Sequence, residues 1–224
     1  MNYAIIKQLV NKDWQLNKGP LTLYVVMGFA SLWVFTIPTE FAFTLGIILL
    51  VSILAIIGIH MVVTTVLHER KDQTLTFVMS LPVSFKEYTL AKILSISIVS
   101  GGAWLLIFST VLGFSIMLDS IGNGLIPYMV MTLVHMLVIY AVLMATAIVS
   151  ENEIATIIVM TLLNVSISIF MMGIANLEDV GPFISGQVAV WNDTSIGIVL
   201  LQLFTIVLSV YMTFYFQSKK RSYL

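Results

Sequence analysis

Charged residues gather in one short stretch of an otherwise apolar chain. The chain has ten basic and eleven acidic residues, and seven of these 21 lie within residues 69–92. The stretch 68–87 reads HERKDQTLTFVMSLPVSFKE and has long apolar runs on both sides. Acids and bases alternate at its beginning, so the chemistry it offers is ion pairing and hydrogen bonding with a protein surface rather than attraction to anionic lipid. A simpler interpretation stays open, because cytosolic loops are also charged merely where they lie in water near headgroups.

Apolar side chains in the same stretch fall at helical spacing. Leu75, Val78 and Met79 share one face at i, i+3 and i+4, while the charges precede them. Pro82 disfavours helical geometry at Leu81, which predicts that this short helix ends near Ser80. We call these three residues the apolar stripe. Its side chains need to be buried away from water, either in membrane lipid or in a groove on a partner protein.

Two capping boxes predict helix starts. In the first, Ser84 and Glu87 satisfy free amides at the beginning of the helix that follows the charged stretch. In the second, Ser150 and Glu153 begin a later helix. Glu151 and Glu153 are candidates for a second contact with a cytosolic partner, although compensation of the helix dipole is the simpler explanation and the preferred one.

Composition sets the class of protein that must position these residues. Hydrophobic residues make up 59%, charged residues 9%, and the mean hydropathy is +1.06. A soluble domain carries about 25% charged residues, so this chain cannot cover itself with a polar surface. We therefore expect a single all-α integral membrane domain over residues 1–224. Because cysteine is absent, the chain can have neither disulfides nor cysteine metal sites. Six segments reach the length of a membrane span: 20–37, 41–67, 88–118, 125–149, 153–175 and 195–217.

The basic residues predict an orientation. With six spans, both termini and the loops after spans two and four share one side, and all ten Lys and Arg residues fall on it. The positive-inside rule therefore predicts that both termini and residues 68–87 are cytoplasmic.

Residues 1–18 have the pattern of an amphipathic helix in the membrane interface. Apolar residues lie on one helical arc (Ile5, Ile6, Leu9, Val10 and Leu16) and polar ones on the opposite arc (Lys7, Asn11, Lys12, Gln15 and Lys18). Asp13 departs from the pattern, since it falls near the apolar arc. An ordinary anchored tail is the alternative. At the other side, residues 176–194 are too broken for a span and too apolar for a free loop, which favours a re-entrant segment or a loop resting on the bilayer.

The charged stretch resembles the cytosolic loop of ABC-2-type transporter permeases. The resemblance rests on Glu69-Arg70, Thr74, the run Ser80-Leu81-Pro82-Val83-Ser84 and Lys92, while Gln73 and Phe85 depart from the usual pattern. It implies six spans, an N-terminal elbow helix and a coupling helix between spans two and three. It also implies contact with an ATPase through a set of loop residues: Glu69, Arg70, Lys71, Asp72, Thr74, Leu75, Val78, Met79, Ser80, Leu81 and Pro82.

Energy would have to come from another chain. The sequence has no G-x-x-x-x-G-K-[ST] phosphate loop, so we expect no enzyme activity and no cofactor here, with ATP and Mg bound by the partner. The resemblance implies two ATPase subunits, a second permease chain (identical or different), surrounding lipid, no nucleic acid, and a location in the plasma (cytoplasmic) membrane of a bacterium.

The polar residues inside the expected spans are few. His60, His135 and Asn164 are candidates to line a pathway, but such residues are more often hydrogen-bonded packing residues than sites. No Lys, Arg, Asp or Glu lies mid-span, which argues against an ion-coupled carrier. We therefore expect export of a hydrophobic or amphipathic compound. The alternative is a non-transporting membrane protein, of immunity or sensor type, that binds a cytosolic partner through residues 68–87.

Overall fold

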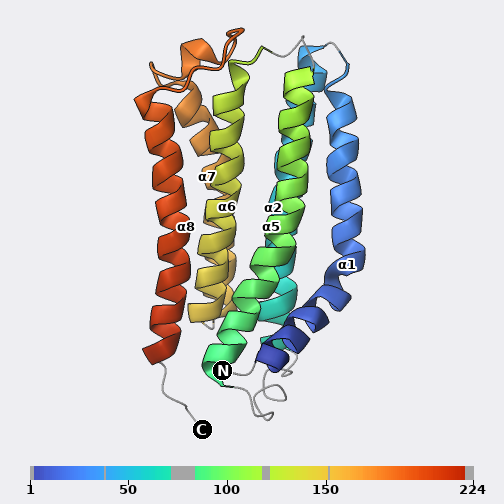
Figure 1. The fold of residues 1–224 in the computed structure, drawn as a ribbon, viewed down its shortest axis with the longest axis vertical. Helices are drawn as coiled ribbons and strands as arrows, with labels where there is room; N and C mark the ends of the chain where they lie inside the picture. Colours follow the sequence, from blue (N-terminus) through green and yellow to red (C-terminus); the bar gives the residue numbers. More distant parts are fainter. Residues whose placement is uncertain (1–2, 38, 72–83, 118–121, 151, 220–224) are drawn as a thin grey trace.

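The computed structural model is an all-helical bundle in the residues it describes, which are 3–37, 39–71, 84–117, 122–150 and 152–219 (Figure 1). The long helices are α1 (Tyr3–Val34), α2 (Glu40–Val62), α5 (Phe85–Met117), α6 (Leu125–Ser150), α7 (Glu153–Ala175) and α8 (Asp193–Lys219). A π-helical turn η1 (Val63–Leu67) joins α2 to the short α3 (His68–Lys71), and η2 (Gly181–Phe183) is a 3₁₀ turn. Helices suit an apolar chain in lipid because each satisfies its own backbone hydrogen bonds.

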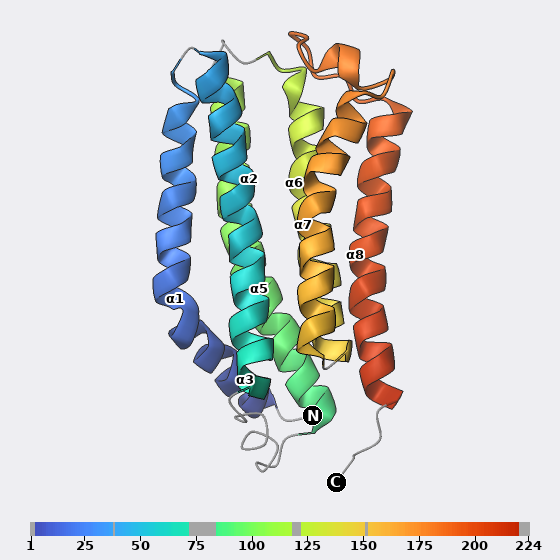
Figure 2. The same cartoon turned by 180° about the vertical axis from the view of Figure 1, so that it is seen from behind.

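The long helices form two groups that pack side by side. The first group is α1, α2 and α5, and the second is α6, α7 and α8 (Figures 1 and 2). They meet where α2 and α5 touch α6 and where α5 touches α8. Gly58 of α2 allows a close approach between the groups, because a Cβ there would lie 2.1 Å from the ring of Tyr140 on α6.

Five helical stretches in the described part of the chain are long and apolar enough to cross a membrane. They are Phe41–Lys71, Lys86–Phe114, Leu125–Ser150, Glu153–Ala175 and Asp193–Gln217. These match five of the six predicted spans. The remaining one, residues 20–37, begins in the second half of α1 and extends past the end of that helix at Val34, so its helical apolar part is short. The multi-pass membrane class is confirmed, while the count of six stays a prediction.

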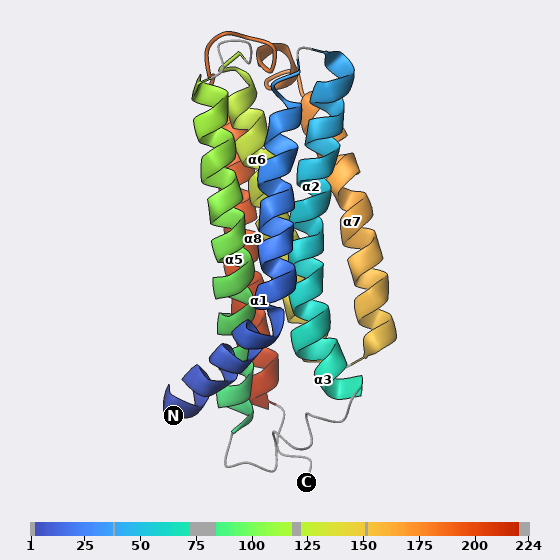
Figure 3. The same cartoon turned by 90° about the vertical axis from the view of Figure 1, so that its right-hand side faces the viewer.

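The predicted interfacial helix is helical but does not stand alone. Residues 3–34 form one helix with Pro20 inside it. Proline removes a backbone hydrogen bond and its ring crowds the preceding turn, which bends a helix. Figure 3 shows that the first part of α1 lies at a steep angle to the second part of the same helix and points away from the bundle. The buried residues of this part are Ile6, Leu9, Asp13 and Asn17, whereas Leu16 is 70% exposed and lies off the buried face.

One predicted capping box is confirmed and the other is wrong. The Glu87 carboxylate accepts hydrogen bonds from the backbone nitrogen and the hydroxyl of Ser84 (2.9 and 2.8 Å), and α5 begins directly after Ser84. At α7 the cap is Asn152, whose side-chain oxygen accepts from the amides of Ile154 and Ala155. Ser150 cannot cap α7 because it is the last residue of α6.

Residues 176–192 lie across one end of the bundle, opposite the end where α1 begins and α8 finishes (Figure 1). The amide of Gly124 donates to the carbonyl of Gly186 (2.9 Å), and Thr194 donates to Asp179 (2.6 Å). Val180 is buried against Met131 and Ile174. This segment therefore covers the ends of α6 and α7. Whether it enters the lipid stays a prediction.

Candidate functional site

Four charged side chains, three of them buried and one partly exposed, form a cluster where α1, α3 and α5 meet, near the beginning of α1. Lys92 of α5 is fully buried and donates to both carboxylate oxygens of Asp13 (3.1 and 2.9 Å) and to Glu69 (2.7 Å). Asp13 is 1% exposed and Glu69 8%. We call Lys12, Asp13, Glu69 and Lys92 the ion-pair cluster. Its formal charge is zero, which lets it persist in a poorly hydrated place, since an unpaired buried charge is very costly.

Lys12 and Tyr88 also contact the Glu69 carboxylate. The ammonium of Lys12 pairs with Glu69 and lies 3.4 Å from Asp13. The Tyr88 hydroxyl donates to the second Glu69 oxygen (3.0 Å). Burial alone would lower the pKa of Lys12, but its hydrogen bond to Glu69 and the charges of Glu69 and Asp13 outweigh burial and raise that pKa. Lys12 is therefore held in its charged form.

The position of Asp13 on the apolar side of its helix now has a reason. Ile6 and Leu9 of α1 pack on Tyr88 and Ala91 of α5, and Asp13 continues the same face to reach Lys92. The next turn is tied to the second helix of the group. Asn17 accepts a hydrogen bond from Thr64 (2.8 Å) in the π-helical turn.

The π-helical turn sets the direction of the residues that follow it. Met61, Thr65 and Glu69 are all buried at a spacing of four residues through η1, so the turn brings Glu69 onto the face that already packs inside the bundle. Such turns are rare within helices and often mark functional positions.

Arg70, the neighbour of Glu69, reaches the other helix group. Its guanidinium donates to the carbonyls of Ala147 (2.7 Å) and Ile148 (3.1 Å) in the last turn of α6. Gln217 of α8 donates to the same Ile148 carbonyl (2.6 Å). The last carbonyls of a helix lack partners within it, so these side chains satisfy the end of α6 while joining α3 and α8 to it. Successive side chains of α3 thus connect it to both groups of helices.

Of the residues predicted to contact an ATPase, the structure describes only a few, and the rest lie outside its described residues. Glu69 and Arg70 turn inward to other helices of this chain, while Lys71 is exposed. The other predicted contacts, Asp72, Thr74, Leu75, Val78, Met79, Ser80, Leu81 and Pro82, lie outside the described residues, as does Glu151. Glu153 is exposed at the start of α7. Contact between these residues and a partner stays a prediction.

Sequence reasoning did not identify Asp13, Lys12 and Tyr88 as part of this site. Two signals point to them: an acid on the apolar arc of an amphipathic helix, and a lysine, Lys92, within an apolar run. Each needs a buried partner of opposite charge, but the sequence does not say which one. Asp13 and Lys92 are 79 residues apart.

The polar residues singled out within the spans have packing partners. His60 lies at an edge-to-face angle to Tyr24 (ring centroids 5.4 Å apart). His135 stacks on Phe170 (4.1 Å) and lies 3.4 Å from the Ser166 hydroxyl. The Asn164 side chain donates to its own helix, at the Met160 carbonyl. These contacts favour packing roles for all three.

Comparison with known proteins identifies the family. A sequence profile described as "ABC-2 family transporter protein" matches residues 5–221. No curated protein and no solved structure was found to match the chain. The match covers every helix described above except the first two residues of α1. The chain therefore belongs to the ABC-2 family of transporters and is a permease of that type.

Proposed function

We propose that this permease works in an ATP-driven exporter of hydrophobic or amphipathic compounds, together with a second permease chain and two ATPase subunits. ATP and Mg would bind to the ATPase subunits. The family supports the general role, because permeases of this kind are membrane subunits that depend on a separate ATPase. The observation that carries the proposal is the anchoring of α3: Glu69 ties it to α1 and α5, and Arg70 ties it to α6.

That anchoring supports a mechanical role for the segment that follows α3. Residues 72–82 would dock on the ATPase through the stripe of Leu75, Val78 and Met79. Movement of the docked segment would act first on α3. Because α3 is fixed to three long helices through charged hydrogen bonds, a displacement would pass to α1, α5 and α6 instead of being lost in a flexible loop.

The placement of charge supports the orientation. The described basic residues belong to the beginnings of α1 and α5, to α3 and to the end of α8, which all lie at one end of the bundle (Figures 1 and 2). Glu178, Asp179 and Asp193 lie in or beside the segment that covers the opposite end. The positive-inside rule then assigns the basic end to the cytoplasm, where an ATPase would be.

Copurification tests the proposal. We would solubilise the chain from its native membrane and identify the soluble proteins that remain bound. The expected result is an ATPase with a phosphate-binding loop, lost when Leu75→Asp and Met79→Asp are combined. The matched control, Gln73→Asp with Thr76→Asp, adds the same charge away from the stripe and should keep the ATPase. A chain recovered alone, under conditions that hold a known transporter together, would favour the immunity or sensor alternative.

A further inference from the structure

A groove opens between the beginning of α5 and the end of α8, at the basic end of the bundle (Figure 1). Its volume is about 420 Å³, within the range of about 300–1,000 Å³ that ligand pockets have. The side chains that line it come from these two helices: Lys86, Thr89, Leu90, Tyr211, Phe214, Tyr215 and Gln217. Because Gln217 also donates to the Ile148 carbonyl, the α8 wall is fixed to the end of α6. The groove therefore has walls of rigid helix.

Both walls change from apolar to basic towards the same end of the bundle. On α5, Leu90 lies about one turn farther from the basic end than Lys86, or about 6 Å along the helix axis. On α8, Lys219 lies about two turns closer to that end than Tyr211. The Lys219 ammonium donates to the Tyr215 hydroxyl (2.5 Å), which places a second positive charge at the rim of the groove. A ligand that fits this gradient has a charged end and an apolar end.

The charge of the groove is positive in the part of the chain that the structure describes. No aspartate or glutamate is among the described residues that line it. Glu87 follows Lys86 in the sequence, but it is 8% exposed and its carboxylate accepts hydrogen bonds from Ser84. The lysines of the ion-pair cluster, in contrast, are paired with acids. Lys86 and Lys219 therefore offer the groove's charge to an anionic ligand.

An exposed apolar track continues from the groove along α8. Phe204, Val207 and Tyr211 recur at three and four residues, so they lie on one face of the helix, and they are 62–67% exposed. In a chain that spans a membrane, an exposed apolar face of this kind contacts the acyl chains of lipid. The groove thus joins a cationic pocket to a surface that is suited to acyl chains.

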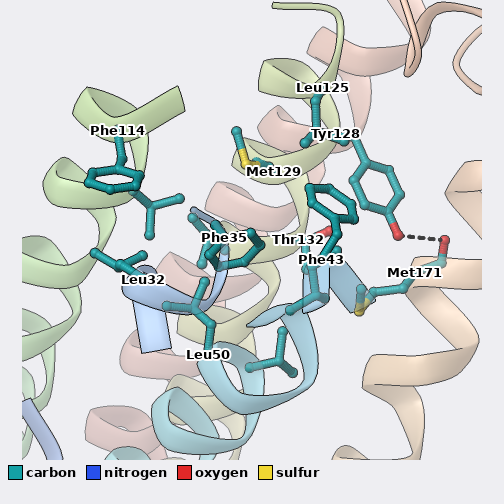
Figure 4. Close-up of a pocket in the computed structure, with 14 residues that line it drawn as sticks. Leu32, Phe35, Phe43, Leu50, Phe114, Leu125, Tyr128, Met129, Thr132 and Met171 are labelled. Atoms are coloured by element: carbon teal, nitrogen blue, oxygen red, sulfur yellow. Dashed lines mark hydrogen bonds between the residues drawn. The ribbon is translucent and has the colours of Figure 1, made fainter. Parts of the chain in front are cut away.

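The cavity at the opposite end of the bundle has none of these features. Figure 4 shows the apolar side chains that converge on it, among them Phe35, Phe43 and Leu50. Its volume is about 60 Å³, and no charged side chain of the described chain lines it. Such a space is explained by packing between the two groups of helices, whereas the groove at the basic end is not.

We propose that the groove between α5 and α8 binds the headgroup of an anionic phospholipid, such as phosphatidylglycerol. The ammonium groups of Lys86 and Lys219 contact the phosphate, Leu90 and Phe214 contact the glycerol and the first methylene groups, and the acyl chains follow the exposed track on α8. Basic pockets between membrane helices bind such headgroups, and tyrosine suits the membrane interface. This inference goes beyond the proposed transport function, and its test needs neither ATP nor an ATPase.

Native mass spectrometry tests the site on the full chain, purified in detergent. The chain is titrated separately with phosphatidylglycerol and with phosphatidylcholine of the same acyl chains, and the fraction that carries one lipid gives an apparent Kd for each. A lysine near an anionic headgroup contributes about five-fold in affinity, so two lysines should give a preference of about 25-fold for phosphatidylglycerol. A large excess of inorganic phosphate should not displace the bound lipid. Equal binding of the two lipids, or displacement by inorganic phosphate, would overturn the proposal.

Matched pairs of lysine variants locate the site. Lys86→Gln combined with Lys219→Gln should abolish the preference for phosphatidylglycerol. Lys7→Gln combined with Lys18→Gln removes the same charge from exposed positions of α1 and should keep the preference. All four lysines are exposed, so these variants should fold as the wild type does. An equal loss in the two pairs would mean general attraction to the basic end and would overturn the proposal.

A second pair of variants tests the apolar part of the groove. Tyr211→Ser removes a ring from the wall and should weaken binding of both lipids. Phe216→Ser removes a ring from another exposed position of α8, outside the groove, and should weaken neither. If both variants had the same effect, the lipid would bind along α8 without using the groove, and the proposed site would be wrong.

Discussion

Replacing Lys92 with methionine would remove the cation that Asp13 and Glu69 share. Methionine keeps most of the length of lysine, so the change is mainly one of charge. The wild-type cluster has two positive and two negative groups, and the variant would carry a net charge of −1 in a place where Lys92 is fully buried and Asp13 is 1% exposed. Lys12 remains near both acids, but its side chain is 39% exposed and its distance to Asp13 is 3.4 Å.

The expected loss of stability is large. Removing one partner of a buried ion pair typically costs about 3–5 kcal/mol, because the remaining charge is left uncompensated. Lys12 can take over part of the pairing, so we expect the lower end, about 3 kcal/mol. For a chain of this length that loss corresponds to a fall of roughly 6–12 °C in the midpoint of thermal unfolding. Adding Asp13→Asn to Lys92→Met restores neutrality, and should recover more than half of the loss.

Thermal unfolding in detergent, followed by the fraction of monodisperse protein on size exclusion, measures these differences. Lys71→Met is the matched control, since Lys71 is exposed on α3 beside the cluster and its replacement should change stability by less than about 0.5 kcal/mol. If Lys92→Met unfolded at the same temperature as Lys71→Met, the buried cluster could not be a main tie between α1, α3 and α5. If Asp13→Asn deepened the loss instead of relieving it, uncompensated charge would not be the cause.

Further outcomes follow from the same geometry. Arg70→Lys keeps the charge but loses the two-carbonyl geometry at the end of α6, so it should reduce ATP-driven transport in a reconstituted complex while binding of the ATPase persists. Gly58→Ala would overpack the contact with the Tyr140 ring and cost about 1–3 kcal/mol in thermal unfolding, whereas Gly102→Ala, with no atom within 4 Å, should be tolerated. Because the pKa of Lys12 is raised in the folded protein, the contribution of Lys12 to stability is complete below its ordinary pKa of 10.5 and is lost as pH rises through the raised value. The unfolding temperature of the wild type should therefore fall across this alkaline range. In Lys12→Met this part of the fall should be absent.

Local signals in the sequence predicted most of the helices. They did not predict which residues from distant parts of the chain contact one another. The start of α5 follows from Ser84 and Glu87, which are three residues apart and act on one another. The cap of α7 was misplaced because Ser150 and Asn152 both suit the role, and only the end of α6 decides between them.

The same distinction applies to the candidate site. The charge-rich stretch after an apolar run led us to predict a functional contact at residues 68–87. The periodicity of the sequence did not predict that the side chains of Glu69 and Arg70 point into the bundle. The inward turn of both depends on the π-helical turn before them and on Asp13 and Lys92, which come from distant parts of the chain. Asp13 on an apolar arc and Lys92 within an apolar run were both visible in the sequence, but nothing in the sequence indicated that the two side chains form a pair.

Helix α5 links the ion-pair cluster to the second group of helices. Its first turns hold Lys92 in the ion-pair cluster, and 12 residues later the Trp104 indole donates a hydrogen bond to the Leu133 carbonyl of α6. That distance is about 18 Å along a rigid helix. The indole is also buried and stacks on Phe108, so packing as well as the hydrogen bond holds α5 to α6 at this point. If an ATPase docks as proposed, displacement of α3 would therefore reach α5 through Glu69 and Lys92 and α6 through Arg70, and the contact between Trp104 and α6 would carry part of the movement from one group of helices to the other.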